Sequence, residues 1–443
     1  MKRLLFIFSF FFLLALNGKA QEVEVLTLED CLRIGIDNNL LLEGKRKEIQ
    51  KNKYGVSENR SKLLPQINAI AGYSNNFDPP VSVTDGSSYG VPYNITETLQ
   101  HSANAGLEMQ MPLFNQTLYT SMSIAKVMEE ISHLSYGKAR EDVILQISKM
   151  YYLGQVTAEQ IMLIKANITR LKELRDITQA FFDNGMSMEV DLKRVNINLE
   201  NLQVQYDNAQ AMMKQQLNML KYIMDYPAEK EIALTPVNTD SITTVALTGL
   251  SENIYELQLS QSQVQLAERQ KRIITNGYIP SLSLTGSWRY AAYTDKGYHW
   301  FHSGPSNHWF RSYGVGLTLR IPIFDGLDKT YKIRKAMIDI ENSKLAWEDA
   351  RKNLQTQYLN AVNDLMNNQR NFKKQKDNYL LAEDVYAVTS DRYREGIASM
   401  TEVLQDEMQM SEAQNNYISA HYNYRVTNLM LLKLTGQIES LLK

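Results

Sequence analysis

The stretch AGLEMQMPLFN, residues 105–115, recurs as VGLTLRIPIFD at residues 315–325. In each copy apolar residues alternate with small or polar ones up to a proline, and a long segment poor in glycine and proline follows. Alternation with a period of two predicts a β-strand that has one apolar and one polar face. We therefore expect a two-faced strand that leads directly into a long helix, and we expect this arrangement twice.

Two further matches occur in the same order and at nearly the same offset. The stretch LPQIN at 64–68 resembles IPSLS at 279–283, and FFDNGM at 181–186 resembles RYREGI at 392–397. A tandem duplication explains all three matches, and the period is far too long for a solenoid. We predict two structural repeats, residues 21–248 and 249–443. Each should contain a helix, a β-hairpin, a very long helix, a sharp turn and a long return helix.

The hairpin strands are predicted at about 66–76 and 101–113, and again at about 281–292 and 311–322. Strands of about ten residues suit a tilted bilayer crossing, and their Ser, Gly, Asn, Gln and Thr faces suit a water-filled lumen. Half of a soluble sheet and an aromatic-rich exposed loop are the alternative explanations. Aromatic residues at the ends of the strands favour the membrane interface, and the candidates are Trp288, Tyr290, Trp309, Phe310 and Tyr313.

The predicted helices are unusually long, at about 116–183, 188–225, 326–394 and 399–435, with a linker at 226–248. Residues 327–394 contain neither glycine nor proline, and a helix of that length extends about 100 Å. A heptad seam rich in tyrosine runs through it: Leu354, Tyr358, Ala361, Leu365, Asn368, Phe372, Gln375, Tyr379, Ala382, Tyr386, Thr389 and Tyr393. Dry two-stranded coiled coils prefer Leu or Ile at such positions. The seam therefore favours helices packed side by side around a wide, wet tube.

Residues 1–20 have the pattern of a secretory signal peptide. Lys2 and Arg3 precede an apolar run of 13 residues, and small residues lie at the expected cleavage site before Gln21. A membrane anchor is the alternative, but a spanning helix needs about 20 apolar residues. No later segment is apolar enough to span as a helix, so the exported chain is either soluble or crosses the membrane as a β-barrel. Acidic residues before Cys31 argue against lipid attachment there.

Composition excludes several classes of protein. The chain of 443 residues has 47 Lys and Arg, 49 Asp and Glu, and one Cys. Its net charge of −2 is unsuitable for a nucleic-acid binder, and a single Cys excludes a disulfide framework. The sequence has no nucleophile elbow, phosphate loop or dinucleotide fingerprint, so we predict neither an enzyme nor a cofactor. His299, His302 and His308 could bind a transition metal, but an aromatic polar loop explains them, and no metal site is predicted.

With its duplication, its two Gly-containing strands that end in Pro-x-Phe, and its two glycine turns, the chain resembles the TolC-like outer-membrane efflux protein family over about residues 27–436. The resemblance implies a mainly α protein with membrane β-structure. It implies a homotrimer with a 12-stranded β-barrel, four strands from each chain, continued by a long periplasmic α-helical barrel. Four strands are too few to close a barrel, since single-chain barrels begin at eight. The linker at 226–249 would contribute to a belt around the tube.

The resemblance also implies a function in transport. The chain would be the outer-membrane exit duct of a tripartite efflux or secretion system, with an inner-membrane pump, a periplasmic adaptor and outer-membrane lipid as partners. The hairpin tips near 75–100 and 292–311 would face the outside. The family does not identify the cargo. A soluble periplasmic coiled-coil adaptor is the first alternative, and a surface-exposed structural or adhesive protein is the second.

Two sets of site residues follow from the resemblance. The glycine turns are the predicted adaptor-docking surface, although a glycine after a helix can be only a C-cap: Asn184, Gly185, Met186, Ser187, Glu395, Gly396, Ile397 and Ala398. In the family, aspartates just past the second turn line the periplasmic aperture. Here the first position is Glu402 and the second is Gln405. Solvated helix charges are the alternative for the aperture candidates, Asp183, Asp191, Glu402, Gln405 and Asp406.

Overall fold

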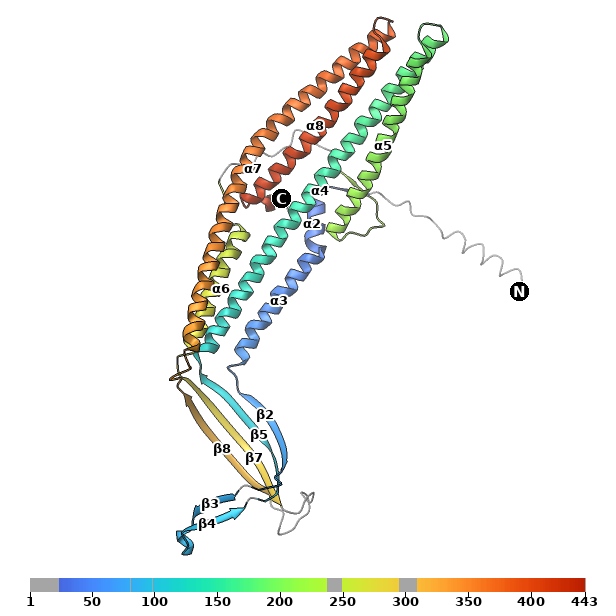
Figure 1. Ribbon diagram of the computed structural model, residues 1–443. Helices are drawn as coiled ribbons and strands as arrows, with labels where there is room; N and C mark the ends of the chain where they lie inside the picture. The colour runs from blue at the N-terminus through green and yellow to red at the C-terminus, as the bar shows by residue number, and fades with distance from the viewer. Residues whose placement is uncertain (1–23, 80, 98, 237–248, 295–308, 443) are drawn as a thin grey trace, which may run out of the picture. The chain divides into compact units, whose positions relative to one another are not determined.

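The computed structural model describes residues 24–442 except for 80, 98, 237–248 and 295–308 (Figure 1). The predicted signal peptide and the three loop histidines lie outside the described residues. The chain divides into two compact units. Unit 1 contains Met1–Lys47, Leu134–Leu259 and Glu348–Lys443, and unit 2 contains Glu48–His133 and Ser260–Trp347. Each unit therefore combines segments of both sequence repeats, so the compact units and the repeats divide the chain differently.

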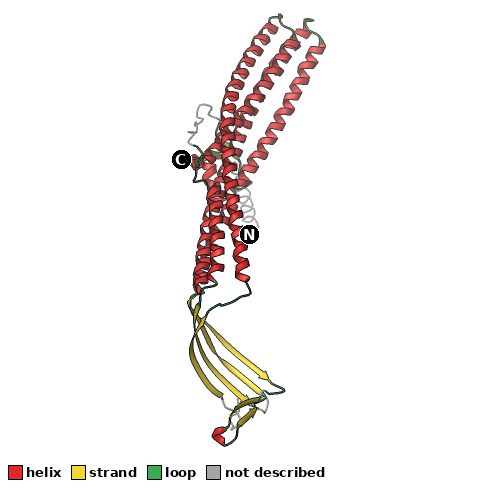
Figure 2. Ribbon diagram, turned by 60° about the vertical axis from the view of Figure 1, so that its left-hand side comes forward, coloured by secondary structure: helices red, strands yellow, loops and turns green. Residues whose placement is uncertain are grey.

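Unit 2 is built around a four-stranded antiparallel sheet of order β2-β5-β7-β8. The strands are β2 (Gln66–Asn75), β5 (His101–Phe114), β7 (Ser281–Thr294) and β8 (Trp309–Arg320), and Figure 2 shows them as one curved sheet. The strands β2 and β5 come from the first repeat, and β7 and β8 from the second. Pairing of β5 with β7 thus joins the two repeats into a single sheet.

The strand register separates the side chains into two faces. Glu108 lies opposite Asn68 and Ser287, and Ser287 lies opposite Gly314. The neighbouring register positions are apolar, with Leu107 opposite Ala69 and Trp288. Since side chains alternate between faces along a strand, one face is mainly polar and the other mainly apolar, as the alternation predicted; Phe310 on the polar face and Arg311 on the apolar face are exceptions.

Unit 2 contains one further sheet in the described part of the chain. The strands β3 (Val81–Asp85) and β4 (Tyr93–Glu97) pair antiparallel, with a short 3₁₀ turn, η1 (Ser87–Tyr89), between them. This hairpin was not expected from the sequence, where the segment has several Gly, Pro and Ser residues. Helix α3 (Leu40–Ser61) leads into β2, and α6 (Tyr255–Asn276) leads into β7. Asn276 at the end of α6 donates to Thr120 Oγ1 over 2.6 Å.

Unit 1 contains four long helices, and two of them begin in unit 2. They are α4 (Gln116–Asp183), α5 (Glu189–Met224), α7 (Asp328–Arg394) and α8 (Met400–Leu434), and Figure 1 shows them as two helical hairpins, α4 with α5 and α7 with α8. Six residues of the heptad seam of α7 are buried: Leu354, Tyr358, Ala361, Leu365, Tyr386 and Tyr393. Phe372 of the same seam stacks on Tyr417 with ring centroids 5.8 Å apart.

Short elements pack against the middle of α4. Strands β1 (Glu24–Leu26) and β6 (Ile232–Leu234) form a parallel pair. Tyr151 of α4 lies under this pair, with its hydroxyl 2.5 Å from Thr235 Oγ1. Helix α2 (Leu28–Asn38) begins with a capping box between Thr27 and Asp30, and its Gly35 lies so close to Ile147 that a Cβ would clash. The C-terminal 3₁₀ helix η2 (Ile438–Leu442) completes the group, so part of the predicted linker belongs to a packed layer.

Glu141 of α4 makes the stability of this region depend on pH. Its side chain is buried, and burial raises its pKa from about 4.5 to about 7, with Lys433 opposing and Glu439 and Asp142 adding to the rise. The folded chain therefore binds more protons than the unfolded chain between pH 4.5 and 7, so the free energy of unfolding falls as pH rises through this window. We expect Glu141→Gln to remove this decline and to stabilise the protein by about 2 kcal/mol above pH 7.

Denaturant unfolding of the detergent-solubilised protein at pH 5 and pH 8 measures this effect. Glu130→Gln is the matched control, because Glu130 lies on the same helix and is exposed, so the loss of its charge should leave the pH dependence unchanged. An equal pH dependence in Glu141→Gln and the parent protein would contradict the assignment.

Among the described residues, no helix is long and apolar enough to cross a membrane. The same part of the chain has no group of three or more His, Cys, Asp or Glu side chains that could hold a metal ion.

Candidate functional site

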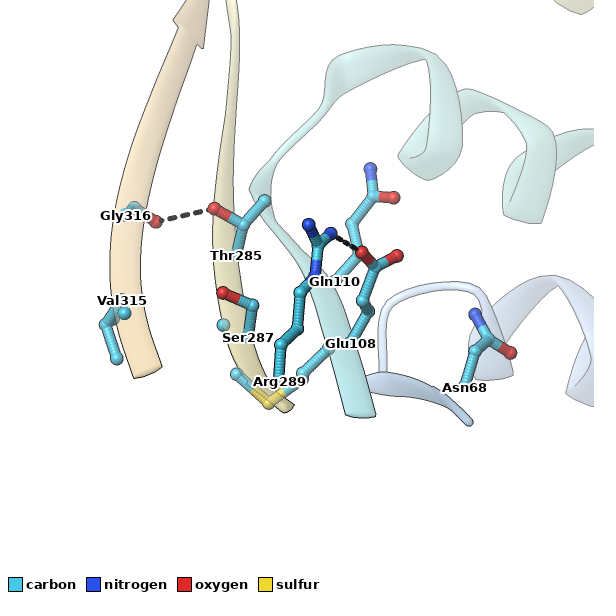
Figure 3. A pocket seen from close by; sticks show the side chains of 11 residues that line it. Asn68, Glu108, Gln110, Thr285, Ser287, Arg289, Val315 and Gly316 are labelled. Carbon is cyan, nitrogen blue, oxygen red and sulfur yellow. Dashed lines mark hydrogen bonds and ion pairs between the residues drawn. The ribbon is translucent and has the colours of Figure 1, made fainter. Parts of the chain in front are cut away.

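The polar face of the sheet is hollowed near its middle, as Figure 3 shows. The hollow has a volume of about 470 Å³. Gly314 and Gly316 of β8 leave it open, since neither has a side chain, and Thr285 donates to the Gly316 carbonyl over 3.3 Å. Its polar side chains come from β2, β5 and β7: Asn68, Glu108, Gln110, Thr285, Ser287 and Arg289. Glu108 and Arg289 form an ion pair across the β5–β7 boundary.

The apolar face carries four of the five predicted interface aromatics. Trp288 and Tyr290 alternate onto it from β7, and Trp309 and Tyr313 from β8. The rings of Trp288 and Tyr290 pack edge to face with centroids 5.2 Å apart. Phe310 has the opposite parity and lies on the polar face, opposite Ala291. Four of the five predicted aromatics therefore share the apolar face, and their role at the membrane interface stays a prediction.

The two helical hairpins end in turns of the same geometry. After α4, Gly185 has a φ of 72°, and the Met186 N–H donates to the Phe181 carbonyl over 2.8 Å. After α7, Gly396 has a φ of 74°, and the Ile397 N–H donates to the Arg392 carbonyl over 2.8 Å. These are Schellman caps, which require a left-handed residue that is usually glycine. The repeated glycine thus has a structural reason in both turns.

Both turns expose apolar side chains. Met186 is 69% exposed and Met188 71% in the first turn, and Ile397 is 63% exposed in the second. Asn184 and Glu395 are also exposed, whereas Ser187 is half-buried. Ala398 is buried in the hydrophobic core of the hairpins and is not available for docking. The expectation that all four residues of the second turn form a surface was wrong at this position, because the side chain packs inward as α8 begins.

The aperture candidates lie close to these turns but have different surroundings. Glu402 is exposed and completes a capping box, with its Oε2 accepting from the Ser399 N–H over 3.3 Å. Asp191 is half-buried and pairs with Arg194. Asp183 is exposed and accepts from Gln179 over 2.8 Å. Gln405 is exposed and Asp406 half-buried. The structure therefore gives Glu402 a capping role, which does not depend on its charge.

The capping role of Glu402 allows its charge to be removed without loss of the cap, which tests whether that charge lines a pore. Glutamine also completes a capping box, so Glu402→Gln removes the charge and keeps the helix start, and Asp406→Asn is nearly isosteric. If these side chains line the mouth of a pore, we expect the double variant to lower the K⁺ over Cl⁻ permeability ratio about twofold or more, since rings of carboxylates favour cations. Reversal potentials across a planar bilayer measure the ratio. Glu412→Gln, an exposed carboxylate further along α8, is the control, and an unchanged ratio in the double variant would argue against pore-lining carboxylates.

Polar contacts join the two helical hairpins near their ends. Arg170 of α4 pairs with Glu383 of α7 over 3.1 Å, and Arg194 of α5 donates to Thr401 of α8 over 3.4 Å. Tyr393 of α7 donates to Thr178 of α4 over 3.3 Å. These contacts hold the second hairpin against the first, and the sequence offered no signal for them because each joins residues far apart in the chain.

Sequence reasoning also missed a buried carboxyl group beneath these contacts. Glu407 of α8 is only 5% exposed, and its Oε1 has no hydrogen-bond partner among the described residues. Burial raises the pKa of Glu407, and the positive charge of Arg170 opposes the rise. Glu407 lies two residues after the exposed Gln405 and directly after the half-buried Asp406, so burial changes from exposed to core within two positions of one helix.

Comparison with known proteins agrees with the architecture. The family model described as outer membrane efflux protein matches the chain twice, over residues 35–224 and 248–437. The two matches cover most of the chain, and their order along it is that of the two sequence repeats. The chain therefore belongs to the outer membrane efflux protein family, whose members are passive channels of the outer membrane and not enzymes.

Individual relatives are distant but cover most of the chain. The outer membrane protein TolC of Vibrio cholerae is 21% identical over 403 residues, 86% of this chain and 84% of the relative. The toluene efflux pump outer membrane protein TtgC of Pseudomonas putida is 23% identical over 381 residues, covering 81% and 75%. The crystal structure of CusC aligns with a TM-score of 0.77 at 16% identity and covers 95% of both chains. The fold is that of the TolC-like channels, with a helical barrel and a β domain.

Proposed function

We propose that the chain is the outer-membrane exit duct of a tripartite export system and that it works as a homotrimer. Substrates delivered by an inner-membrane pump and a periplasmic adaptor would pass through it to the outside without chemical change. The observation that carries the proposal is the sheet of unit 2, which has a polar face, an apolar face and two open edges. In a soluble adaptor, the apolar face and the two edges of such a sheet would be exposed to water.

The directions of the two edge strands fit a barrel that three copies of the chain share. In the order β2-β5-β7-β8 every neighbouring pair is antiparallel, so the edge strands β2 and β8 run in opposite directions. Strand β8 of one chain can therefore pair antiparallel with β2 of the next. Open edges are a liability in isolated sheets, and closure into a barrel removes them. Three chains then give 12 strands with polar side chains inside and apolar side chains toward lipid.

The long helices also carry faces that a single chain leaves open. On α5, exposed apolar residues recur every seven positions at Val190, Ile197 and Val204. On α7, the exposed Leu359 and Met366 are seven positions apart, and the exposed Leu380 follows two heptads later, with Lys373 at the position between. A heptad stripe of apolar residues is the pattern by which helices pack against a partner helix. Neighbouring copies of the chain would cover these stripes and close the helical barrel.

The adaptor is expected at the helical turns. Met186 and Ile397 are exposed apolar side chains held at fixed points by the two Schellman caps, and three copies would present six such points in a ring. An α-helical partner could pack against them through apolar contacts. The cargo is left open.

Native mass and location test the proposal directly. The untagged protein, extracted gently from separated membranes, is expected in the outer-membrane fraction. Its protein mass should be near three times that of one mature chain, which is 50.9 kDa less the mass of the signal peptide. A monomer or dimer in the soluble periplasmic fraction would contradict the duct, because four strands cannot close a pore. That result would favour the adaptor-like alternative.

A further inference from the structure

The polar face of the sheet carries few charges. Among the described residues that alternate onto it, only Glu108, Arg289 and Arg320 are charged. Arg320 is the last residue of β8. Glu108 and Arg289 lie instead at the hollow in the middle of the sheet, on neighbouring strands and two residues out of register, and they form an ion pair. The remaining side chains around them are short or uncharged.

A glycine allows this pair to form. Gly106 lies directly opposite Arg289, and a Cβ there would lie 2.4 Å from the Trp288 carbonyl oxygen and 3.0 Å from Arg289 Cγ. Any larger residue at 106 would displace the arginine. With glycine, the Arg289 side chain runs over β5 toward Glu108, as Figure 3 shows.

The pair is open to the hollow and retains unused hydrogen-bonding capacity. The side chains of Arg289 and Glu108 are 48% and 39% exposed. Arg289 donates to Glu108 through Nη2, and its other guanidinium nitrogens have no partner among the described residues. Exposed ion pairs contribute little to stability, typically below about 1 kcal/mol, so stability alone does not account for a charged pair in an otherwise uncharged wall.

We propose that Arg289 is a transient binding point for anionic groups of passing solutes, such as carboxylates, sulfonates or phosphates, and that Glu108 weakens this binding. Arginine presents several N–H donors that match such groups. Conduction requires binding that is favourable enough to enter and weak enough to leave, and an adjacent carboxylate lowers the attraction. This inference rests on the proposed duct, in which three copies of the pair would surround the lumen.

Charged thiol reagents measure the local charge at the hollow. Ser287→Cys places a thiol beside the pair, and the native Cys31 is fully buried, so the new thiol is the accessible one. The probes are two methanethiosulfonates of similar size, one carrying a sulfonate and one a trimethylammonium group. We expect Glu108→Gln to raise the sulfonate-to-ammonium rate ratio about fivefold and Arg289→Gln to lower it by a similar factor. The double variant is expected to return to within about twofold of the parent.

The controls separate this inference from the duct itself. Arg311→Gln removes a charge near the end of β8 on the opposite face and is expected to leave the ratio unchanged. Val315→Cys, on the apolar face and 80% exposed in the single chain, should face lipid and react with neither probe. A reactive Val315→Cys or an unreactive Ser287→Cys would contradict the duct. A reactive Ser287→Cys whose ratio ignores both charge variants would overturn the inference and leave the duct intact. Each variant is compared only after its recovery from the outer-membrane fraction has shown that it folds and inserts like the parent.

Discussion

Replacement of Leu317 by lysine is expected to remove the protein from the outer membrane. Leu317 is an inner residue of β8 on the apolar face, opposite Leu284, and is 66% exposed in the single chain. In a shared barrel that surface meets lipid, where a lysine near the bilayer midplane costs about 2–4 kcal/mol. Each trimer carries three copies of the substitution, so the combined cost is comparable to the whole stability of many folded domains.

The adjacent residue supplies the control. Thr318 belongs to the same strand but alternates onto the polar face, opposite Ser283, so Thr318→Lys adds the same charge on the side proposed to face water. We expect Thr318→Lys to insert normally and Leu317→Lys to be absent from the outer-membrane fraction, or present at less than a tenth of the parent amount. Equal insertion of the two variants would mean that the apolar face does not meet lipid.

The contrast between these two residues follows from alternation, and alternation is the feature that sequence reveals most directly. The four strands of the sheet could be located because they alternate with a period of two. The long helices could be located because they contain few or no Gly and Pro residues, and α7 also because its seam has a period of 3.5. The positions of the two turns followed from single glycines after such helices. The duplication helped, because each weak signal occurred twice.

Features that depend on contacts between distant segments could not be located in this way. Strands β1 and β6 are three residues each and pair Glu24 with Ile232, which is too short for any period. The pairing of β5 with β7 is equally invisible in the sequence, and so therefore is the ion pair between Glu108 and Arg289. The burial of Glu407 and Ala398 depends on how the helices are rotated against each other, which a shift of one residue alters.

Tryptophan at both Met186 and Ile397 is expected to abolish export while leaving insertion intact. The two side chains are exposed at the turns, and apart from the adjoining residues of the chain no described atom lies within 4 Å of a Cβ built on Gly185 or Gly396. A bulky residue beside either glycine therefore has room in the free protein and should not disturb the Schellman caps. It would instead obstruct a partner that packs on the turn, because a well-packed interface loses several kcal/mol when its central contacts are displaced.

A matched substitution separates a docking defect from a general effect of tryptophan. Met212 of α5 is 52% exposed and lies many helical turns from the tip, so Met212→Trp should transport normally. The variants are compared in cells that depend on this duct for resistance to a toxic compound, together with cross-linking to the adaptor. We expect resistance to fall to the level of the deletion strain in the double tip variant, with the trimer still present in the outer membrane. Full resistance with tryptophan at both positions would mean that the turns are only helix caps, and the docking surface would then have to lie on the sides of the helical hairpins.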